Sequence, residues 1–332
     1  MRTAFIKELA ELACTNDALF LVVADLGYSV VETFAEKFPA RYLNSGVAEQ
    51  NTTGLAAGLA SEGYHVFTYS IANFPTFRCA EQIRNDIAYH NLPVTVVAVG
   101  GGLAYGNLGY SHHAVQDYAL LRTFPNMLIA APGDPAETRA CLRHLTAAPR
   151  PSYLRLGKAG EPTVHTSDPE VAEGKLVPVI PAPANHANET SSSGTSAFRP
   201  SELQNFPRNL LLTTGAALKL AHDALLAKPS PDWQLCSLPL WSENSKPRVA
   251  ESLRSYDAIV TVEDHLHAGG FGSYISETLA SVGIQKPIRH IALSETVCGL
   301  VANQSTLNDK GGLNIPAIHR AMSVLASQGV TN

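Results

Sequence analysis

The chain has 332 residues, more than a single domain usually holds, so two domains with separate hydrophobic cores are expected. Its formal net charge is -5 and it has no basic stripe, which argues against a nucleic acid partner. The five cysteines are scattered and lack C-x-x-C spacing, so neither a disulfide framework nor a structural zinc site is expected. The N-terminal helical pattern carries both signs of charge, which indicates a cytoplasmic chain without an export signal or membrane span.

The first half of the chain alternates short apolar runs with helical patterns. Apolar runs bounded by Gly, Pro or Asp are typical of buried strands, and they occupy 18–24, 94–99, 127–131 and 152–156. Apolar residues at helical spacing occupy 48–61, 77–90 and 135–146. Because this alternation is typical of a parallel sheet covered on both faces, residues 1–165 are predicted to form one α/β domain.

The composition changes after the first domain. Residues 166–208 are rich in Pro and Ser with little periodic apolar pattern, so they are predicted to be a long, mobile linker. Strand and helix patterns resume at 210–213, 216–227, 258–262 and 289–293. Residues 209–332 are therefore predicted to form a second, smaller α/β domain, which makes the fold α/β with two parallel-sheet domains.

One segment, NSGVAEQNTTGLAAGLASEG at 44–63, places Glu49 at the start of a helix rich in Ala, Gly and Leu. A glutamate at this place can simply favour the helix dipole. The segment nevertheless resembles the C-terminal half of transketolase, and the resemblance spans both domains outside the linker. It implies a thiamine-diphosphate pyrimidine-binding domain followed by a transketolase C-terminal domain.

In the family that this segment resembles, the glutamate matched by Glu49 hydrogen-bonds a ring nitrogen of the cofactor's aminopyrimidine. A carboxyl group in an apolar pocket can share a proton with that nitrogen and favour the imino tautomer, which leaves the exocyclic imine as an internal base. The resemblance therefore implies that Glu49 binds the cofactor and is catalytic.

Two further segments resemble the cofactor contacts of the family. The run YSIANFPTFRCAEQ at 69–82 puts Phe74 where family members stack a ring on the aminopyrimidine, with Ile71 and Phe77 completing the wall. Ordinary core packing is the alternative explanation for these side chains. The turn that closes the first strand also matches the family, so Asp25 and Gly27 are expected among the cofactor-binding residues.

The loop 99–116, VGGGLAYGNLGYSHHAVQ, contains glycines and paired histidines after a strand, which suggests close approach to a ligand. His112 aligns with the family's active-site histidine, and the adjacent His113 is expected to reach the substrate. The family's sugar-binding aspartate and phosphate-binding histidine fall at Leu108 and Gly100. Because an unpaired buried hydroxyl costs ~1–3 kcal/mol, the substrate is expected to differ from an ordinary ketose phosphate.

Several side chains lie near positions that bind substrate anions in the family. They are Arg2, Ser29, Arg155 and Lys158. Solvation at the surface is the alternative role for these residues. The predicted substrate-binding set consists of Arg2, Ser29, Leu108, His113 and Arg155.

The chain contains no Gly-Asp-Gly motif, which the family uses with Mg2+ to hold the cofactor's diphosphate. The resemblance therefore implies that a partner A subunit supplies the diphosphate-binding domain and the Mg2+, in a two-plus-two heterotetramer. The expected function is that of the B subunit of a split transketolase, which transfers a two-carbon ketol unit from a ketose to an aldehyde.

Three alternatives stay open. The β subunit of a 2-oxo acid dehydrogenase decarboxylase component has the same domain order, and Leu108 and Gly100 fit it better. A deoxyxylulose-phosphate synthase-like activity fits less well, since that enzyme also has an aspartate where this chain has Leu108. A noncatalytic scaffold of the same fold would not need Glu49, Phe74 and His112 together.

Overall fold

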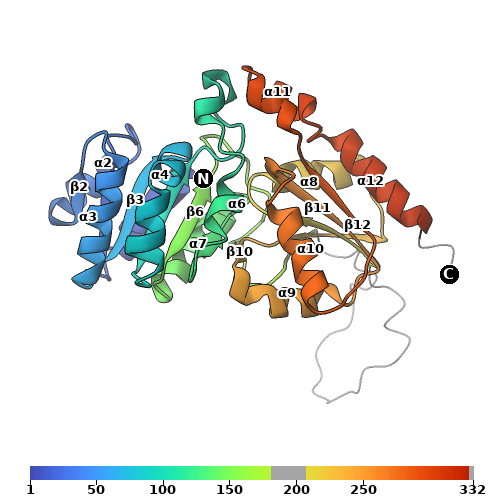
Figure 1. Ribbon diagram of the computed structural model, residues 1–332, viewed down its shortest axis with the longest axis horizontal. Helices are drawn as coiled ribbons and strands as arrows, with labels where there is room; N and C mark the ends of the chain where they lie inside the picture. The colour runs from blue at the N-terminus through green and yellow to red at the C-terminus, as the bar shows by residue number, and fades with distance from the viewer. Residues whose placement is uncertain (181–206, 329–332) are drawn as a thin grey trace, which may run out of the picture.

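The computed structural model describes residues 1–180 and 207–328. It contains two sheets flanked by helices, which confirms the predicted α/β class (Figure 1). The first sheet has seven strands in the order β10-β5-β6-β4-β3-β1-β2. Its parallel strands are β1 Leu19–Val23, β2 Tyr42–Asn44, β3 His65–Ile71, β4 Val94–Val99, β5 Leu128–Ala130 and β6 Ser152–Leu156.

Helices cover both faces of the first sheet because side chains alternate between its faces. The helices are α1 Arg2–Leu12, α2 Glu32–Lys37, α3 Glu49–Ser61, α4 Asn73–Phe77, α5 Ala80–Gln82, α6 Asp117–Leu121 and α7 Pro135–Ala147, with a π-helical segment η2 Ile83–Ala88. Odd-numbered residues of β1 share a core with α1, α2 and α7, and even-numbered residues share one with α3 and η2. The helix expected at 77–90 is instead divided among α4, α5 and η2, because Cys79 departs from helical geometry with φ -108° and ψ 11°.

The second sheet has five strands in the order β12-β11-β8-β9-β7. They are β7 Val177–Ile180, β8 Asn209–Thr213, β9 Trp233–Ser237, β11 Ala258–Leu266 and β12 Ile288–Leu293. Its helices are α8 Ala217–Ala227, α9 Lys246–Leu253, α10 Phe271–Ser281, α11 Gln304–Lys310 and α12 Ile315–Gln328. Strand β7 lies inside the range predicted as linker and pairs antiparallel with β9, whereas residues 181–206 of that range lie outside the described residues.

A short strand from the second half of the chain joins the first sheet. Strand β10 (Leu240–Trp241) pairs antiparallel with β5 at the edge of that sheet. The buried Trp241 ring packs against Tyr118 from the first half and against Phe271 and Tyr274 of α10. The two sheets are thus connected through both backbone and side chains, and the predicted domain boundaries at 165 and 209 stay a prediction.

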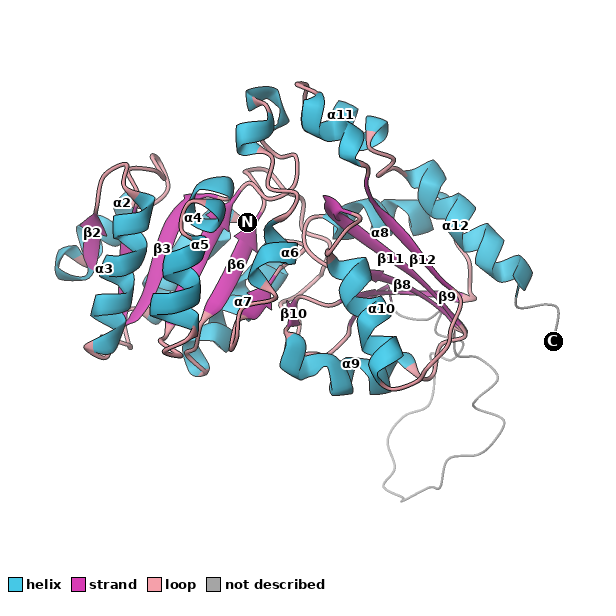
Figure 2. Cartoon of the chain, viewed as in Figure 1, coloured by secondary structure: helices cyan, strands magenta, loops and turns pink. Residues whose placement is uncertain are grey.

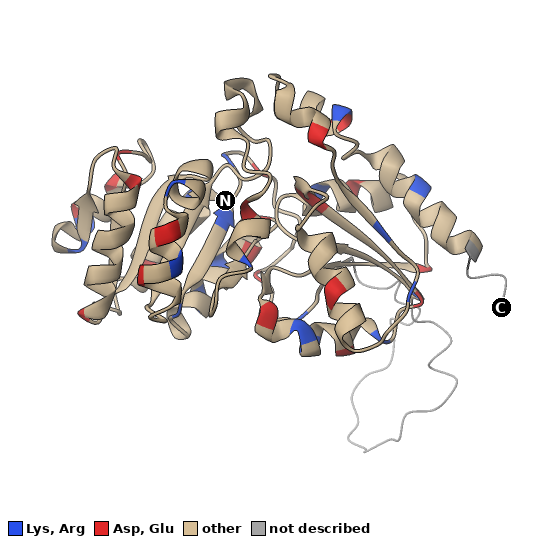
Figure 3. Ribbon diagram, viewed as in Figure 1, with Lys and Arg blue, Asp and Glu red and all other residues tan. Residues whose placement is uncertain are grey.

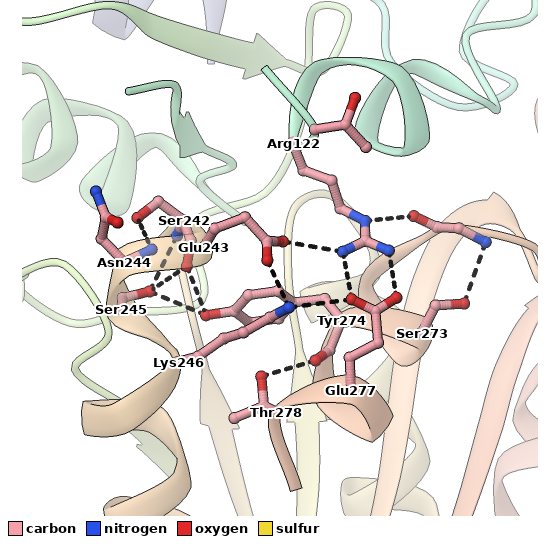
Figure 4. A network of polar contacts seen from close by, with 12 residues as sticks. Arg122, Ser242, Glu243, Asn244, Ser245, Lys246, Ser273, Tyr274, Glu277 and Thr278 are labelled. Atoms are coloured by element: carbon pink, nitrogen blue, oxygen red, sulfur yellow. Dashed lines mark hydrogen bonds and ion pairs between the residues drawn. The ribbon is translucent and has the colours of Figure 1, made fainter. Parts of the chain in front are cut away.

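Ion pairs also connect the two halves of the chain (Figure 4). Nη1 of Arg122, which follows α6, donates to carboxylate oxygens of Glu277 at 2.9 Å and of Glu243 at 3.0 Å. Its Nε donates to the carbonyl oxygen of Gly269 at 2.9 Å, and Lys246 pairs with both glutamates. Figure 3 shows positive and negative residues interspersed over both domains, in keeping with such mixed networks.

The helices of residues 1–180 and 207–328 include none with the length and apolar character that a membrane span requires.

A buried group of titratable side chains lies at the N-terminus of α7. Asp134 caps the helix: its Oδ1 accepts from the backbone N–H of Glu137 at 2.8 Å, and its Oδ2 is 3.1 Å from Nδ1 of His165. Nε2 of His165 lies 3.6 Å from Oε1 of Glu137. Burial raises the pKa of Glu137 to about 7 and also raises the pKa of the Cys141 thiol. Burial lowers the pKa of His165, but the hydrogen bond to Asp134 and the charges of both carboxylates raise it overall.

We expect the contribution of Glu137 to the free energy of unfolding to fall by ~2 kcal/mol between pH 5 and pH 8. Its folded-state pKa of about 7 exceeds the ordinary value of 4.5, so its stabilising contribution is complete below pH 4.5 and is lost as pH rises through 7. The raised pKa of His165 acts in the same direction. Urea unfolding of the wild type and Glu137→Gln at pH 5, 6.5 and 8 isolates the Glu137 contribution. The same change with pH in both proteins would contradict the prediction.

Candidate active site

Loops from several strands meet at one edge of the first sheet. Strands β1, β2, β3, β4 and β6 are parallel, so the segments that follow them lie at the same edge, where open α/β sheets bind ligands. Helices α3 and α4 begin at this edge and cover the same face of the sheet (Figure 2). The candidate site is built from these segments.

Glu49 is the first residue of α3, and its side chain is buried. Its Oε2 accepts a hydrogen bond from Nη1 of Arg78 at 3.1 Å. Thr53 Oγ1 donates to the Glu49 carbonyl oxygen at 2.9 Å, and the small residues Ala56 and Ala60 pack α3 onto the sheet. The helix therefore fixes a carboxylate at the sheet edge, beside one cation.

Phe74, Arg78 and His112 extend from this carboxylate as a continuous series of contacts. The Arg78 guanidinium carbon lies 4.2 Å from the Phe74 ring centroid. The Phe74 and His112 rings meet edge to face, with centroids 5.2 Å apart and an interplanar angle of 69°. The structure thus brings together three predicted residues, Glu49, Phe74 and His112. It adds Arg78, which was not predicted from the sequence although it stands one helical turn after Phe74.

The His112 imidazole is held by its neighbours. Its Nδ1 is 3.0 Å from the Ser111 hydroxyl, and the Ser111 carbonyl oxygen accepts from Asn73 Nδ2 at 2.9 Å. Burial, the charge of His113 and the charge of Arg78 lower the pKa of His112. At neutral pH the ring is therefore neutral, which suits a group that accepts or donates a single proton.

Ile71 and Phe77, the other residues predicted to line the cofactor ring beside Phe74, differ in exposure. Ile71 ends β3 and is half-buried, whereas Phe77 at the end of α4 is exposed over 42% of its surface. Leu108 is also exposed, at 51%. Because Phe77 and Leu108 are so exposed, they can enclose a ligand only if another protein surface covers it from the other side.

The turn after β1 is constrained by its backbone. Asp25, Gly27 and Ser29 all have positive φ, at 51°, 97° and 62°. A Cβ at Gly27 would lie 2.8 Å from Cγ1 of Val31, so a side chain has no room there. Asp25 Oδ1 accepts from Asn44 Nδ2 at 3.0 Å, which ties the ends of β1 and β2 together. Such strained turns are frequent at ligand sites.

Tyr105 occupies the space beside Gly100. Gly100 has φ 83°, and a Cβ there would clash with the Tyr105 ring. The ring thus fills the space that a side chain at position 100 would need, and the ammonium group of Lys158 lies 5.3 Å from its centroid. Burial raises the pKa of Tyr105, and the nearby charge of Arg2 opposes that shift. No local sequence pattern predicts that the Tyr105 ring lies against Gly100, because the two residues are five positions apart.

Two predicted substrate residues lie in the protein interior. The Arg155 side chain is 2% exposed, and its guanidinium pairs with Asp117 Oδ2 and Asp264 Oδ1, each at 2.6 Å. His113 is fully buried, with Nε2 3.3 Å from the Gly106 carbonyl oxygen. These placements do not support substrate contacts for either residue: Arg155 joins the two halves of the chain, and His113 supports its own loop.

Arg2 and Ser29 lie closer to solvent. Arg2 is half-buried, and within the described residues its buried Nε has no hydrogen-bond partner. Burial raises the pKa of Tyr69 to about 12, and the charge of Arg2 opposes that shift as it does at Tyr105. Ser29 is exposed, with its backbone N–H donating to Glu32 Oε1 at 2.7 Å. Arg2 and Ser29 thus keep the open position that the predicted substrate role requires.

Comparison with known proteins shows the family of the chain. Residues 1–161 match the family model of the transketolase pyrimidine binding domain, and residues 204–318 match that of the transketolase C-terminal domain. The chain therefore belongs to the transketolase family, whose members depend on thiamine diphosphate.

Two relatives whose names describe a subunit or a split gene align with nearly the whole length of this chain. The B subunit of the apulose-4-phosphate transketolase of Phocaeicola vulgatus is 34% identical over 300 residues, which cover 89% of this chain and 87% of that protein. A solved structure titled split gene transketolase, inactive beta4 tetramer, has a TM-score of 0.79 at 29% identity and covers 98% of this chain and 97% of that one. The 1-deoxy-D-xylulose-5-phosphate synthase of Neisseria meningitidis serogroup A is 30% identical over 324 residues, but these span only 45% of that longer protein.

The residues at the sheet edge fit the family's cofactor. A planar, protonatable ring needs an acceptor at its edge and an aromatic surface beside its face. Glu49 offers a buried carboxylate, and the Phe74 ring already has a planar cation lying over it. The chemistry of these side chains therefore fits the aminopyrimidine part of thiamine diphosphate.

Proposed function

We propose that this chain is the B subunit of a split transketolase, which transfers a two-carbon ketol unit from a ketose to an aldehyde once a partner completes the site. The observation that carries the proposal is the buried Glu49 carboxylate, which Arg78 links to the Phe74 ring, with the His112 ring packed against Phe74. The similarity to the B subunit of another transketolase, over 87% of that protein's length, supports it.

Each of these residues has a defined task in the proposal. Thiamine diphosphate, when bound, supplies a thiazolium carbon that acts as the nucleophile. Glu49 holds a proton at the ring nitrogen of the aminopyrimidine, and Phe74 orients that ring by stacking. His112, neutral at pH 7, exchanges a proton with an oxygen of the substrate. Asp25 and Gly27 shape the turn that approaches the cofactor, with Ile71 and Phe77 beside it.

Apolar side chains around Glu49 support a partner subunit. Val47, two residues before Glu49, is 75% exposed, and Leu55 on α3 and Phe77 on α4 are also exposed. On α3, a Cβ at Gly54 or Gly58 would meet no atom within 4 Å. An open apolar face of this kind beside a buried carboxylate fits coverage by another protein. We propose that this protein is the A subunit, which holds the diphosphate and Mg2+, in a two-plus-two heterotetramer.

Cofactor binding by the separate and mixed subunits tests the proposal. We expect thiamine diphosphate with Mg2+ to bind tightly only when this chain is mixed with a candidate A subunit, such as a protein with the diphosphate-binding domain from the same organism. The mixture is then assayed with ketose phosphates, unphosphorylated ketoses and pyruvate as donors. Ketol transfer from a ketose supports the proposal, and tight binding of the complete cofactor by this chain alone contradicts the shared site.

The β subunit of a 2-oxo acid dehydrogenase component is the second candidate. Two observations favour it. Leu108 is exposed and apolar, and Gly100 has no room for a side chain. Neither position can therefore supply the polar side chain that contacts the sugar in the family. Decarboxylation of pyruvate by the mixture, without ketol transfer, would establish this function instead.

A further inference from the structure

Arg78 makes the two contacts that the proposed function assigns to the aminopyrimidine ring. Its Nη1 donates to Glu49 Oε2 at 3.1 Å, and its Cζ lies 4.2 Å from the centroid of the Phe74 ring. A guanidinium group is planar, delocalised and cationic, with N–H donors at its edge, so it pairs with carboxylates and lies over aromatic faces. An aminopyrimidine protonated on its ring nitrogen is likewise planar and cationic, with an N–H donor at its edge.

We propose that Arg78 occupies the place of the aminopyrimidine ring in the free chain and moves aside when the cofactor binds. This makes Arg78 a positioning residue, because it acts on the reaction only through other residues of the site. The inference rests on the proposed use of thiamine diphosphate by this chain. It adds an internal competitor for the site, which neither the fold nor the family match supplies.

The geometry lets the guanidinium group leave while the fold stays in place. The Arg78 side chain is 52% exposed, whereas that of Glu49 is only 7% exposed. The backbone of Arg78 remains anchored, since its carbonyl oxygen accepts from Gln50 Nε2 at 2.9 Å. An ion pair with one solvated partner is weak and is readily exchanged for another donor.

While it is in place, Arg78 affects the two titratable members of the site, Glu49 and His112. It gives the buried Glu49 carboxylate an opposite charge, without which a buried anion is costly. It also contributes, after burial and His113, to the low pKa of His112. When the guanidinium moves away, Glu49 is free to share a proton with the ring.

Titration of this chain with 4-amino-2-methylpyrimidine tests the inference without any turnover. Calorimetry compares the wild type, Arg78→Met and Arg84→Met. Arg78→Met keeps a side chain of similar length but removes the guanidinium group, and we expect it to bind the probe roughly three- to tenfold more tightly. Arg84→Met is the matched control, because Arg84 is exposed and its Nη1 donates to the adjacent Asn85. Its affinity should equal that of the wild type.

Nuclear magnetic resonance of the arginine side chains gives a second readout. The Nε–H signal of Arg78, identified by its loss in Arg78→Met, should shift when the probe is added to the wild type. In Arg78→Met the pKa of His112, followed by its ring protons, should rise.

Three results would overturn the inference: equal or weaker probe binding by Arg78→Met, probe binding that leaves the Arg78 signal unmoved, or no binding by either protein. The last result counts because Glu49 and Phe74 both belong to this chain. If the probe displaces Arg78 but the mixed subunits show no ketol transfer, the proposed function fails and the inference about Arg78 stands.

Discussion

Replacing Glu49 with Gln should lower ketol transfer by the mixed subunits by at least ~100-fold, the lower range of what a positioned acid–base group contributes. Gln has nearly the same shape and can still accept one hydrogen bond, but its amide cannot share a proton with a ring nitrogen. Because Glu49 is buried at the start of α3, water has little access to replace the carboxylate. Initial rates at saturating cofactor measure the effect on the chemical step.

The matched control for this experiment is Glu62→Gln. Glu62 directly follows α3 and is exposed, so its substitution makes the same chemical change at the opposite end of the helix. The rate of this variant should stay within about twofold of the wild type, since surface substitutions have small effects. A Glu49→Gln enzyme that keeps more than a tenth of wild-type activity would remove Glu49 from the catalytic role.

Replacing Arg155 with Leu should lower the free energy of unfolding by ~3–5 kcal/mol, the cost of leaving buried charges without a partner. Arg155 is the shared counter-ion of Asp117 and Asp264, and its guanidinium also donates to the Ala114 carbonyl oxygen. Loss of the guanidinium group leaves two carboxylates in the interior. Urea unfolding followed by circular dichroism measures the change.

Two comparisons show whether buried charge is the cause. Arg208→Leu removes an arginine that pairs with Asp257, but both side chains of this pair are exposed, so a loss of only ~0–1 kcal/mol is expected. Adding Asp117→Asn and Asp264→Asn to Arg155→Leu should recover part of the stability, because the stranded charges are removed. An Arg155→Leu protein within about 1 kcal/mol of the wild type would contradict this account.

The fold was predictable from the sequence because its signals are local. Apolar runs such as Leu19–Val23 and Val94–Val99 are continuous, as buried parallel strands require, and helical spacing fills the intervals between them. Strand β10 could not be found in this way. It has two residues, and its partner β5 lies far earlier in the chain, so no local pattern marks the pairing.

The site was predictable to the extent that single residue types carry its chemistry. Glu49, Phe74 and His112 each stand in a recognisable segment, and the structure brings them together. Arg155 illustrates the limit: a cation near the end of a strand resembles a ligand for anions until the chain folds Asp117 and Asp264 against it. Charge partners from distant segments decide whether such a side chain is available.

The two-residue strand β10 has a consequence for how this protein can be divided. The pairing of Leu240 with Ala130 and of Trp241 with Ile129 protects the outer edge of the first sheet. A fragment that stopped before the second domain would expose the peptide groups of β5, and open strand edges promote pairing between molecules. The first domain is therefore not an independent module, and protein engineering that cuts the chain between the two domains should trade a protected sheet edge for an aggregation-prone one.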